Sequence, residues 1–343
     1  MPDASDDPLS ADAPAPARFV RDLAAIVGDR AVRHGRFGIA VSGGPDSLAL
    51  LLVAHAALGN RIAAATVDHR LRPEAEDEAR YVAEVCAARG IAHAILVADR
   101  PIDGNIQSAA RALRYRLLDT WRIDHGLDFV LTAHHADDQL ETVIMRLNRS
   151  SGVAGLAGIR ARNGSIVRPV LGWQRIELGD ILAEADLPFV DDPSNRDHRY
   201  DRARLRAALA DADWLDPRAV AKSAALLGEA SEAIEWMTAQ RLRSALVDDG
   251  GVATLAYRGE PHALWHRMVL SALERAQPGI MVGEAAYRRL AAAMARGDKA
   301  SIGDLTVSPI AGQPKRWTIC AAPARCAKAA PSVSEPADKT DRT

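Results

Sequence analysis

The stretch FGIAVSGGPDS at residues 37–47 decides the fold, because a short apolar run there meets serines, glycines, a proline and an aspartate. Residues 37–41 predict a buried strand, and the apolar content of residues 46–58 predicts a helix. Gly43 and Gly44 permit a bend whose backbone N–H groups face an anion, and the helix N-terminus adds free donors and a partial positive charge. An ordinary N-capping turn would explain one Ser or Asp, but not two serines around a Gly-Gly-Pro-Asp core. We therefore predict a phosphate-binding loop.

This loop matches neither of the two common nucleotide-binding patterns. The Walker pattern requires a Lys after its second Gly, and none stands here. The dinucleotide pattern G-x-G-x-x-G is also absent, because Gly43 and Gly44 are adjacent. The loop therefore belongs to a different class.

Short apolar runs alternate with helical patterns through the first half of the chain. The predicted strands lie at residues 37–41, 62–67, 91–97 and 129–133. Short, continuously apolar strands separated by helices indicate an α/β fold with a parallel sheet covered on both faces. Ligands of such sheets bind beyond the carboxyl ends of the strands, and every polar motif discussed here falls at such an end.

The composition, with 48% hydrophobic and 26% charged residues, indicates a globular protein. A net charge of −2 excludes a uniformly basic nucleic-acid binder but not a local basic face. Cys86, Cys320 and Cys326 are too few and too far apart for a disulfide framework or a Cys-based zinc site. No apolar stretch reaches membrane-spanning length and no signal segment opens the chain, so we expect a cytoplasmic protein without membrane contact. Residues 1–16 and 323–343 are expected to be disordered tails.

A second polar cluster, TAHHADDQLET at residues 132–142, follows the fourth predicted strand and runs into a helix. Asp137 and Glu141 stand four residues apart on one flank of the apolar stripe, and two stacked carboxylates near a phosphate loop suit Mg²⁺. Acids in a first helical turn are also favoured by the helix dipole alone, and we prefer that interpretation for Asp138. His134 and His135 are compatible with a satisfied turn pair, and their spacing does not favour zinc.

A basic, glycine-rich connector comes next. Residues 142–176 contain six arginines and no Asp or Glu, whereas solvated loops usually mix both signs. Arginines among small residues suit contacts with the backbone phosphates of a bulky anionic partner. More arginines follow the DDPSN turn at residues 191–195. The candidate arginines for such contacts are Arg160, Arg162, Arg168, Arg202 and Arg206.

These motifs carry a family resemblance. SGGPDS resembles the PP-loop of the N-type ATP pyrophosphatases, and HHADDQLET is similar to the motif of tRNA(Ile)-lysidine synthetases and their 2-thiocytidine relatives. Residues 148–159, 168–171 and 190–206 resemble further lysidine synthetase boxes, although Ala203 stands where the family has Asn. The resemblance spans about residues 36–206 and implies a five-stranded parallel, Rossmann-like sheet of the adenine nucleotide alpha hydrolase type.

The resemblance also implies a reaction. ATP would adenylate the carbonyl oxygen at carbon 2 of the wobble cytidine of tRNA(Ile) with a CAU anticodon, and the ε-amine of free L-lysine would displace AMP. Asp137 and Glu141 would bind Mg²⁺, His134 would contact the reacting phosphate, and the connector arginines would hold RNA. The implied ATP-binding residues are Ser42, Gly43, Gly44, Pro45, Asp46 and Ser47. The oligomeric state is left open, a homodimer included.

Two other functions remain as alternatives. A 2-thiocytidine-type enzyme needs cysteines for sulfur transfer or a cluster, and the single Cys before residue 320 argues against it. A non-catalytic ATP-sensing module would have no need of Asp137, Glu141 and the arginine-rich connector.

The domain boundary is placed after the last resembling segment. We assign residues 17–206 to the catalytic domain, with the basic connector starting near residue 148, and residues 207–322 to a mainly helical, tRNA-binding region. A helical pattern at residues 216–247 opens that region, and a mixed α/β structure is the alternative for the remainder.

Overall fold

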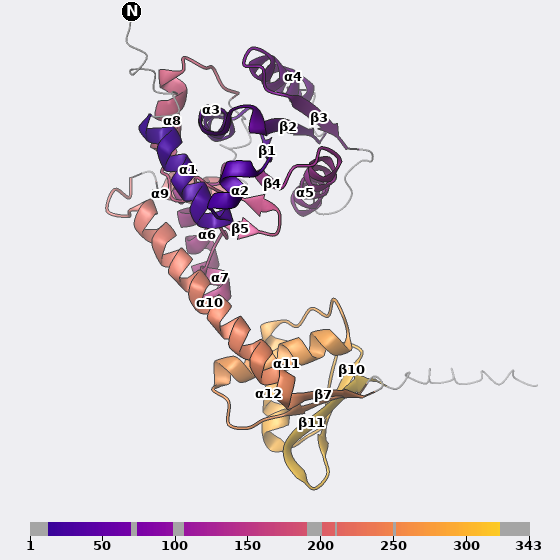
Figure 1. Cartoon of the computed structure of the whole chain (residues 1–343). Coiled ribbons are helices and arrows are strands. Elements are labelled where there is room, and N and C mark those ends of the chain that lie inside the picture. The colour runs from indigo at the N-terminus through magenta and orange to yellow at the C-terminus, as the bar shows by residue number, and fades with distance from the viewer. Residues whose placement is uncertain are drawn as a thin grey trace, which may run out of the picture. The chain divides into compact units, whose positions relative to one another are not determined.

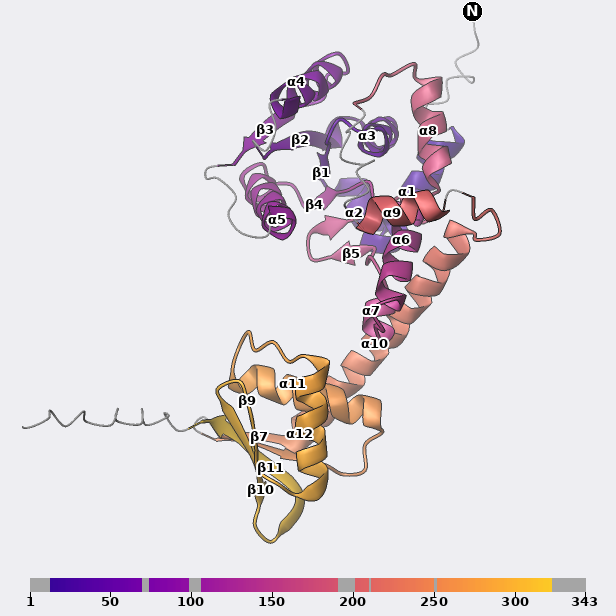
Figure 2. The same ribbon diagram turned by 180° about the vertical axis from the view of Figure 1, so that it is seen from behind.

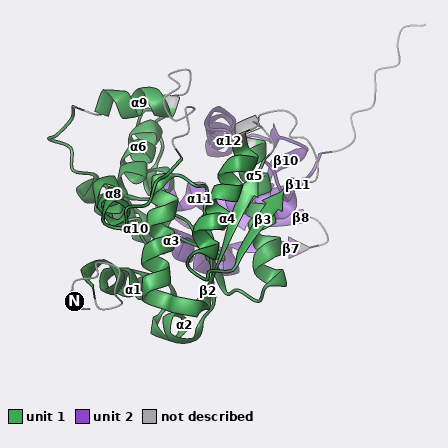
Figure 3. Ribbon diagram, turned by 90° about the horizontal axis from the view of Figure 1, so that it is seen from above, with its two compact units in different colours: residues 1–231 green, residues 232–343 purple. Residues whose placement is uncertain are grey.

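The computed structural model describes residues 13–69, 74–98, 106–190, 201–209, 211–249 and 252–322. The chain divides into two compact units, residues 1–231 and 232–343, which Figure 3 colours separately. Within the tail predicted at residues 1–16, helix α1 (Pro14–Val27) already begins at Pro14. Residues 1–12 and the predicted tail at 323–343 lie outside the described residues.

A six-stranded sheet forms the centre of the first unit (Figure 1). Its order is β3-β2-β1-β4-β6-β5, and all neighbours are parallel except β5 and β6. The strands are β1 (Phe37–Ala40), β2 (Ile62–Asp68), β3 (His93–Val97), β4 (Phe129–Leu131), β5 (Arg162–Asn163) and β6 (Ile166–Val167). The predicted α/β class with a parallel sheet is confirmed. The sheet has one strand more than the expected five. The additional strand is β5, and a strand of two residues is too short to give a recognisable sequence pattern.

Helices cover both faces of this sheet. Ile39, Ala64, Leu131 and Val167 face one core, to which α1, α2 (Asp29–His34), α3 (Pro45–Leu58), α4 (Glu74–Ala87) and α8 (Arg175–Glu184) contribute. The strand neighbours Ala63, Ala65, Val130 and Ile166 face the opposite core, against Leu118 and Trp121 of α5 (Ile106–Asp124). This alternation is the period-two pattern of a sheet buried on both sides, and Figures 1 and 2 show α3 and α5 on opposite faces.

The order of the strands indicates where this sheet would bind a ligand. From β1 the chain proceeds to β2 and β3 on one side, and then returns to β4 on the other side of β1. The carboxyl ends of β1 and β4 therefore flank the switch in strand order, where open α/β sheets bind ligands. Both polar motifs follow these two strands.

Four further helices continue the first unit. They are α6 (Ala136–Leu147), α7 (Val153–Leu156), α9 (Asp201–Leu209) and the long α10 (Pro217–Ala245), whose last part belongs to the second unit. The DDPSN turn at residues 191–195, with Arg196 and Arg199, lies outside the described residues.

The second unit contains a sheet as well as helices. Strands β7 (Leu246–Asp249), β8 (Val252–Ala256), β9 (Ala300–Ile302), β10 (Leu305–Ile310) and β11 (Gln313–Ala321) form an antiparallel sheet in the order β7-β8-β11-β10-β9. Helices α11 (His262–Ala276) and α12 (Glu284–Arg296) pack on it through Met268, Leu273 and Leu290. The sheet agrees with the mixed α/β alternative for this region rather than with a mainly helical one.

Candidate functional site

The predicted phosphate loop is a tight turn between β1 and α3. Gly43 has φ +84°, a conformation that favours glycine, and Gly44 is the N-cap of α3, so that Pro45 starts the helix. The Ser47 hydroxyl donates to the Gly44 carbonyl at 2.9 Å and accepts the Ser42 N–H at 3.1 Å. These bonds close the loop on itself and bury Ser47.

The loop keeps its donors unused. Among the described residues, the backbone N–H groups of Gly43, Gly44, Asp46 and Ser47 have no hydrogen-bond acceptor. Unpaired N–H groups at a helix N-terminus form an anion site, because they donate directly and the helix dipole adds to their effect. This local geometry is what a phosphate group requires.

The second motif starts α6 at the end of β4. Thr132 Oγ1 lies 3.0 Å from Nδ1 of His134, and the Asp138 carboxylate accepts the backbone N–H of His135 at 3.2 Å. Asp138 thus caps the start of α6, a more specific role than the helix-dipole effect that the sequence suggested. It also forms an ion pair with Arg202, at 2.6 Å, which the sequence did not suggest.

His135 joins the two motifs. Its ring is 1% exposed and lies 3.4 Å from carboxylate oxygens of Asp46 and Asp137 and 3.5 Å from one of Asp138. Burial alone would lower the pKa of His135, but contacts with these carboxylates outweigh it and raise the pKa to about 10. A buried imidazolium therefore lies among three aspartates and holds the first turn of α3 to that of α6.

The carboxylate of Asp137 has a second partner besides His135. Its carboxylate accepts the backbone N–H of Arg175, at the N-terminus of α8, at 2.8 Å. Burial opposes ionisation of Asp137, yet His135 and the Arg175 N–H keep its pKa below the usual value. Asp137 is thus an ionised carboxylate beside the phosphate loop.

Glu141 lies on α6 as predicted, but its partners are arginines. Both of its oxygens are taken by arginines of α9: Oε2 by Arg202 Nε at 2.5 Å and Oε1 by Arg206 Nε at 2.7 Å. Glu141 is buried, so these pairs neutralise a charge that water cannot reach. The prediction that Asp137 and Glu141 form a metal-binding pair is not met by this arrangement, because the oxygens of Glu141 are engaged by cations.

The carboxylates beside the phosphate loop still suit magnesium. Among the described residues, no three Asp, Glu, His or Cys side chains are arranged as a metal site. Mg²⁺, however, commonly takes one or two carboxylates and completes its shell with water and substrate phosphates. Asp46 and Asp137 contact His135 through Oδ2, so Oδ1 of each is a hard oxygen donor that fits such a site, whereas arginines engage both oxygens of Glu141.

His134 lies in cationic surroundings. Burial and the positive charges of Arg168, Arg111 and Arg202 lower its pKa to about 4, against the opposing charge of Asp138. His134 is therefore neutral near pH 7, and the same positive potential that keeps it neutral would attract an anion.

The connector arginines have separate roles. Arg168 is buried; it donates to the Arg160 carbonyl at 2.7 Å and to the Tyr115 hydroxyl at 3.4 Å. The expectation that Arg168 contacts RNA is corrected by this burial, since its guanidinium fastens the end of β6. Arg162 is exposed and stacks over the ring of Phe129, with 5.1 Å between guanidinium carbon and ring centroid.

The glycine-rich part of the connector is held by α6. Gln139 is buried; its side chain accepts the Ile159 N–H at 2.6 Å and donates to the Ile159 carbonyl at 3.1 Å. A Cβ on Gly158 would lie 2.3 Å from Gln139 Oε1, so only glycine fits there. Arg146 donates to the Gly155 and Gly158 carbonyls at 2.6 and 2.9 Å. These glycines therefore serve close packing against α6.

Two residues of the site were missed from the sequence. Asp138 was attributed only to the helix dipole, and His135 was interpreted as part of a satisfied turn. The sequence signal that could have identified His135 is its position at the start of a helix with two acids, Asp137 and Asp138, in the first turn, because buried carboxylates require a cation. Its distance of 89 residues from Asp46 hides that contact from any local pattern.

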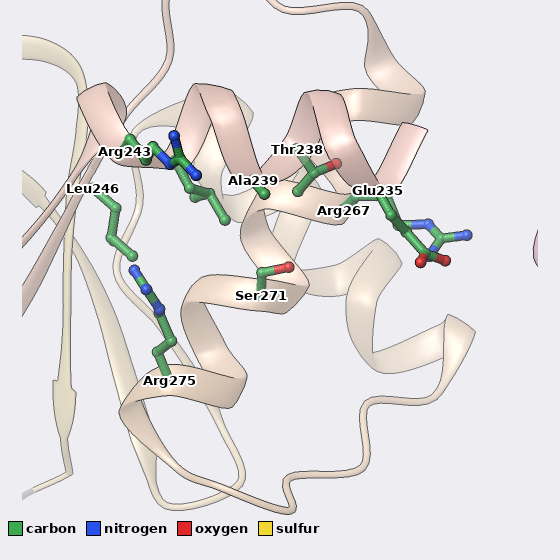
Figure 4. A pocket seen from close by; sticks show the side chains of 9 residues that line it. Glu235, Thr238, Ala239, Arg243, Leu246, Arg267, Ser271 and Arg275 are labelled. Carbon is green, nitrogen blue, oxygen red and sulfur yellow. The ribbon is translucent and has the colours of Figure 1, made fainter. Parts of the chain in front are cut away.

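The second unit contains a polar groove of about 590 Å³ between α10 and α11. Arg267, Ser271 and Arg275 line it at four-residue intervals along one face of α11. Arg243 approaches from α10, and Figure 4 shows Ser271 between Arg267 and Arg275. The groove carries three guanidinium groups and one carboxylate, that of Glu235, which lies 3.8 Å from Arg267, over a partly apolar wall.

No helix among the described residues is long and apolar enough to cross a membrane.

The chain matches the PP-loop domain family over residues 16–212. It is 38% identical over 280 residues to the tRNA(Ile)-lysidine synthase of Zymomonas mobilis, a match covering 79% of this chain and 85% of that protein. It is 47% identical over 209 residues to the tRNA(Ile)-lysidine synthase of Novosphingobium aromaticivorans, covering 59% and 64% of the two chains.

A solved structure shares the fold. The U34-tRNA thiolase NcsA of Methanococcus maripaludis, with its 4Fe-4S cluster, superposes with a TM-score of 0.51 at 16% identity. The match covers 62% of this chain and 79% of that one.

Proposed function

Because this chain belongs to the tRNA(Ile)-lysidine synthase family of PP-loop proteins, we propose that it uses ATP to attach lysine to the wobble cytidine of tRNA(Ile). The carbonyl oxygen at carbon 2 of the cytosine attacks the α-phosphorus of ATP and releases pyrophosphate. The ε-amine of L-lysine then attacks carbon 2, a C–N bond forms, the amine loses a proton, and AMP leaves with the oxygen.

One observation carries this proposal: a phosphate loop and a carboxylate-rich helix start at the carboxyl ends of adjacent parallel strands, joined by His135. The unpaired N–H groups of Gly43, Gly44, Asp46 and Ser47 bind the polyphosphate of ATP. Donors that are already in place need no rearrangement as negative charge moves to the leaving pyrophosphate.

Magnesium has a place in this scheme. Asp46 and Asp137 would hold Mg²⁺ together with the phosphates, and the ion would neutralise the charge of the departing pyrophosphate. His135 keeps both carboxylates in place. Glu141 instead positions Arg202 and Arg206, which bring positive charge to the same helix.

His134 is the side chain that we place at the reacting phosphate. It is neutral near pH 7, so it interacts by hydrogen bonding rather than by charge. Arg111, Arg168 and Arg202, whose charges lower its pKa, supply the positive potential that a pentacoordinate phosphorus needs.

RNA contacts are proposed in the connector and, taken by itself, in the second unit. Arg162 is exposed in the connector, and we retain it and Arg160 as contacts with backbone phosphates. The groove with Arg243, Arg267 and Arg275 suits further phosphates, which supports the assignment of residues 207–322 to tRNA binding. The CAU anticodon, free L-lysine and a cytoplasmic location complete the proposal.

Sulfur transfer is less well supported. Cys86 is buried, and burial raises the pKa of its thiol to about 11, so at pH 7 it is a poor nucleophile. Cys320, on β11, belongs to the other unit. The described part of the first unit thus contains no reactive cysteine.

The direct test is incorporation of labelled lysine. The protein is incubated with ATP, Mg²⁺, labelled L-lysine and an unmodified tRNA(Ile) transcript with a CAU anticodon. We expect label in the RNA, lost when the first anticodon base is changed to U. Bound ATP without AMP formation or labelled RNA would support an ATP sensor instead.

A further inference from the structure

A short strap crosses the phosphate loop. Residues 188–190 follow α8, and the backbone N–H of Val190 donates to the carbonyl of Gly43 at 3.0 Å. The side chain of Val190 also lies against the loop, since a Cβ built on Gly43 would be 3.4 Å from Val190 Cγ2. The strap therefore contacts the one residue of the loop that has a positive φ.

This bond fixes the orientation of a peptide plane. No described peptide bond is cis, so the carbonyl of Gly43 and the N–H of Gly44 point in opposite directions. When Val190 holds the Gly43 carbonyl on the strap side, the Gly44 N–H is directed away from the strap. A peptide between two glycines has little steric preference of its own, and without the strap it could rotate and present its carbonyl to the ligand.

The strap is itself anchored. The hydroxyl of Tyr81, on α4, donates to the carbonyl of Pro188. The adjacent Val82 is fully buried and would lie 3.5 Å from a Cβ on Gly43, so the same turn of α4 supports both the strap and the loop. Strap, loop and α4 form one packed arrangement, although their residues are far apart in sequence.

We infer that the Val190 N–H is a positioning group, which keeps the Gly44 N–H directed at the β- and γ-phosphates of ATP. The inference rests on the proposed function and names a residue that neither sequence motif contains. The strap acts on the pyrophosphate part of the ligand, because the bond it makes controls the loop rather than the sugar or the base. AMP, which lacks that part, should not depend on it.

The test compares Val190→Pro, which removes the N–H, with Val190→Ala, which keeps it. Inhibition of ATP-dependent lysine transfer by inorganic pyrophosphate and by AMP is measured for each. We expect Val190→Pro to weaken inhibition by pyrophosphate and raise KM for ATP roughly 10- to 100-fold, the range of one hydrogen bond to a charged group. Inhibition by AMP should stay within about twofold, and Val190→Ala should resemble the unsubstituted protein.

Tyr81→Phe provides a second variant in case Val190→Pro does not fold. It removes the anchor of the strap without touching the loop, and it should weaken inhibition by pyrophosphate several-fold while inhibition by AMP is unchanged. The inference would be overturned if inhibition by pyrophosphate and inhibition by AMP weakened equally, or if neither weakened. Binding of inorganic pyrophosphate and of AMP is therefore also measured directly by calorimetry: if pyrophosphate binding alone depends on the Val190 N–H in a protein that transfers no lysine, the proposed function fails and the positioning role remains.

Discussion

Replacing His135 by Gln tests the electrostatic centre of the site. The buried ring lies within 3.5 Å of carboxylates from Asp46, Asp137 and Asp138, and its pKa is raised to about 10. His135→Gln leaves these carboxylates without their cation, and removing one partner of a buried ion pair lowers stability by roughly 3–5 kcal/mol. We expect about 3 kcal/mol here, because Asp46 and Asp137 retain partial access to water.

The pH dependence gives the sharper measurement. The folded pKa of His135 lies above the ordinary 6.5, so its contribution is complete below about pH 6.5 and is lost as the pH rises through about 10. At 1.36 kcal/mol for each pKa unit, the free energy of unfolding should fall by about 3 kcal/mol between about pH 7.5 and 10.5. His135→Gln should lack this component in urea denaturation.

His125→Gln is the matched control. His125 is exposed, and among the described residues its side chain hydrogen-bonds only to the Trp121 carbonyl, so replacing it should leave the alkaline decrease in stability intact. Equal pH dependence of the unsubstituted protein and His135→Gln would refute the account of a buried imidazolium, because other groups that titrate near pH 10 are common to both.

Four further substitutions separate the roles assigned to other residues. Gly158→Ala should destabilise the first unit by about 3 kcal/mol in urea denaturation, because its Cβ would meet Gln139 at 2.3 Å and its φ is +63°. Glu141→Gln should slow pyrophosphate release at saturating ATP at least tenfold, because a buried ion pair that positions two arginines is broken. Arg162→Ala should weaken tRNA binding and reduce the log–log salt slope by about 0.7–0.9. Arg168→Ala should lower stability by about 2 kcal/mol instead, because it leaves buried acceptors unpaired.

Controls for these substitutions exist in the chain. Gly164→Ala shares the positive φ but has no neighbour within 4 Å, so it should lower stability by only about 1 kcal/mol. Arg30→Ala removes an exposed charge from α2. This helix directly precedes β1 and so lies at the amino ends of the strands, away from the site at their carboxyl ends. The variant should leave the salt slope of tRNA binding unchanged. An unchanged slope in Arg162→Ala would contradict its contact with phosphate, and normal turnover in Glu141→Gln would contradict its positioning role.

Much of the fold could be predicted because its signals are local. The strand at Phe37–Ala40, the loop and α3 follow each other directly, and burial on both faces gives the strands continuous apolar runs. The short β5 pairs antiparallel with β6 through two residues, which is below the length at which periodicity carries information. In the second unit, the alternating pattern of β10 and β11 is too irregular to separate from a helical one.

The site was predicted less completely, because its decisive contacts are long-range. Helical spacing correctly put Asp137 and Glu141 on one helix, but it could not show that α9 directs two arginines to Glu141. Nor could it show that His135 faces Asp46, or that Arg168 turns inward to the Arg160 carbonyl. Spacing along one element fixes only which residues share a face, and the partners of that face depend on tertiary packing.

The central claim is that the loop after β1 binds ATP for transfer of its α-phosphorus to a nucleobase oxygen. Release of pyrophosphate from labelled ATP in the presence of tRNA, comparing the unsubstituted protein with the Asp46→Ala, Ser47→Ala double variant, tests it most directly. The account predicts that tRNA-dependent release falls to background in the double variant. Undiminished release from a folded double variant would contradict it.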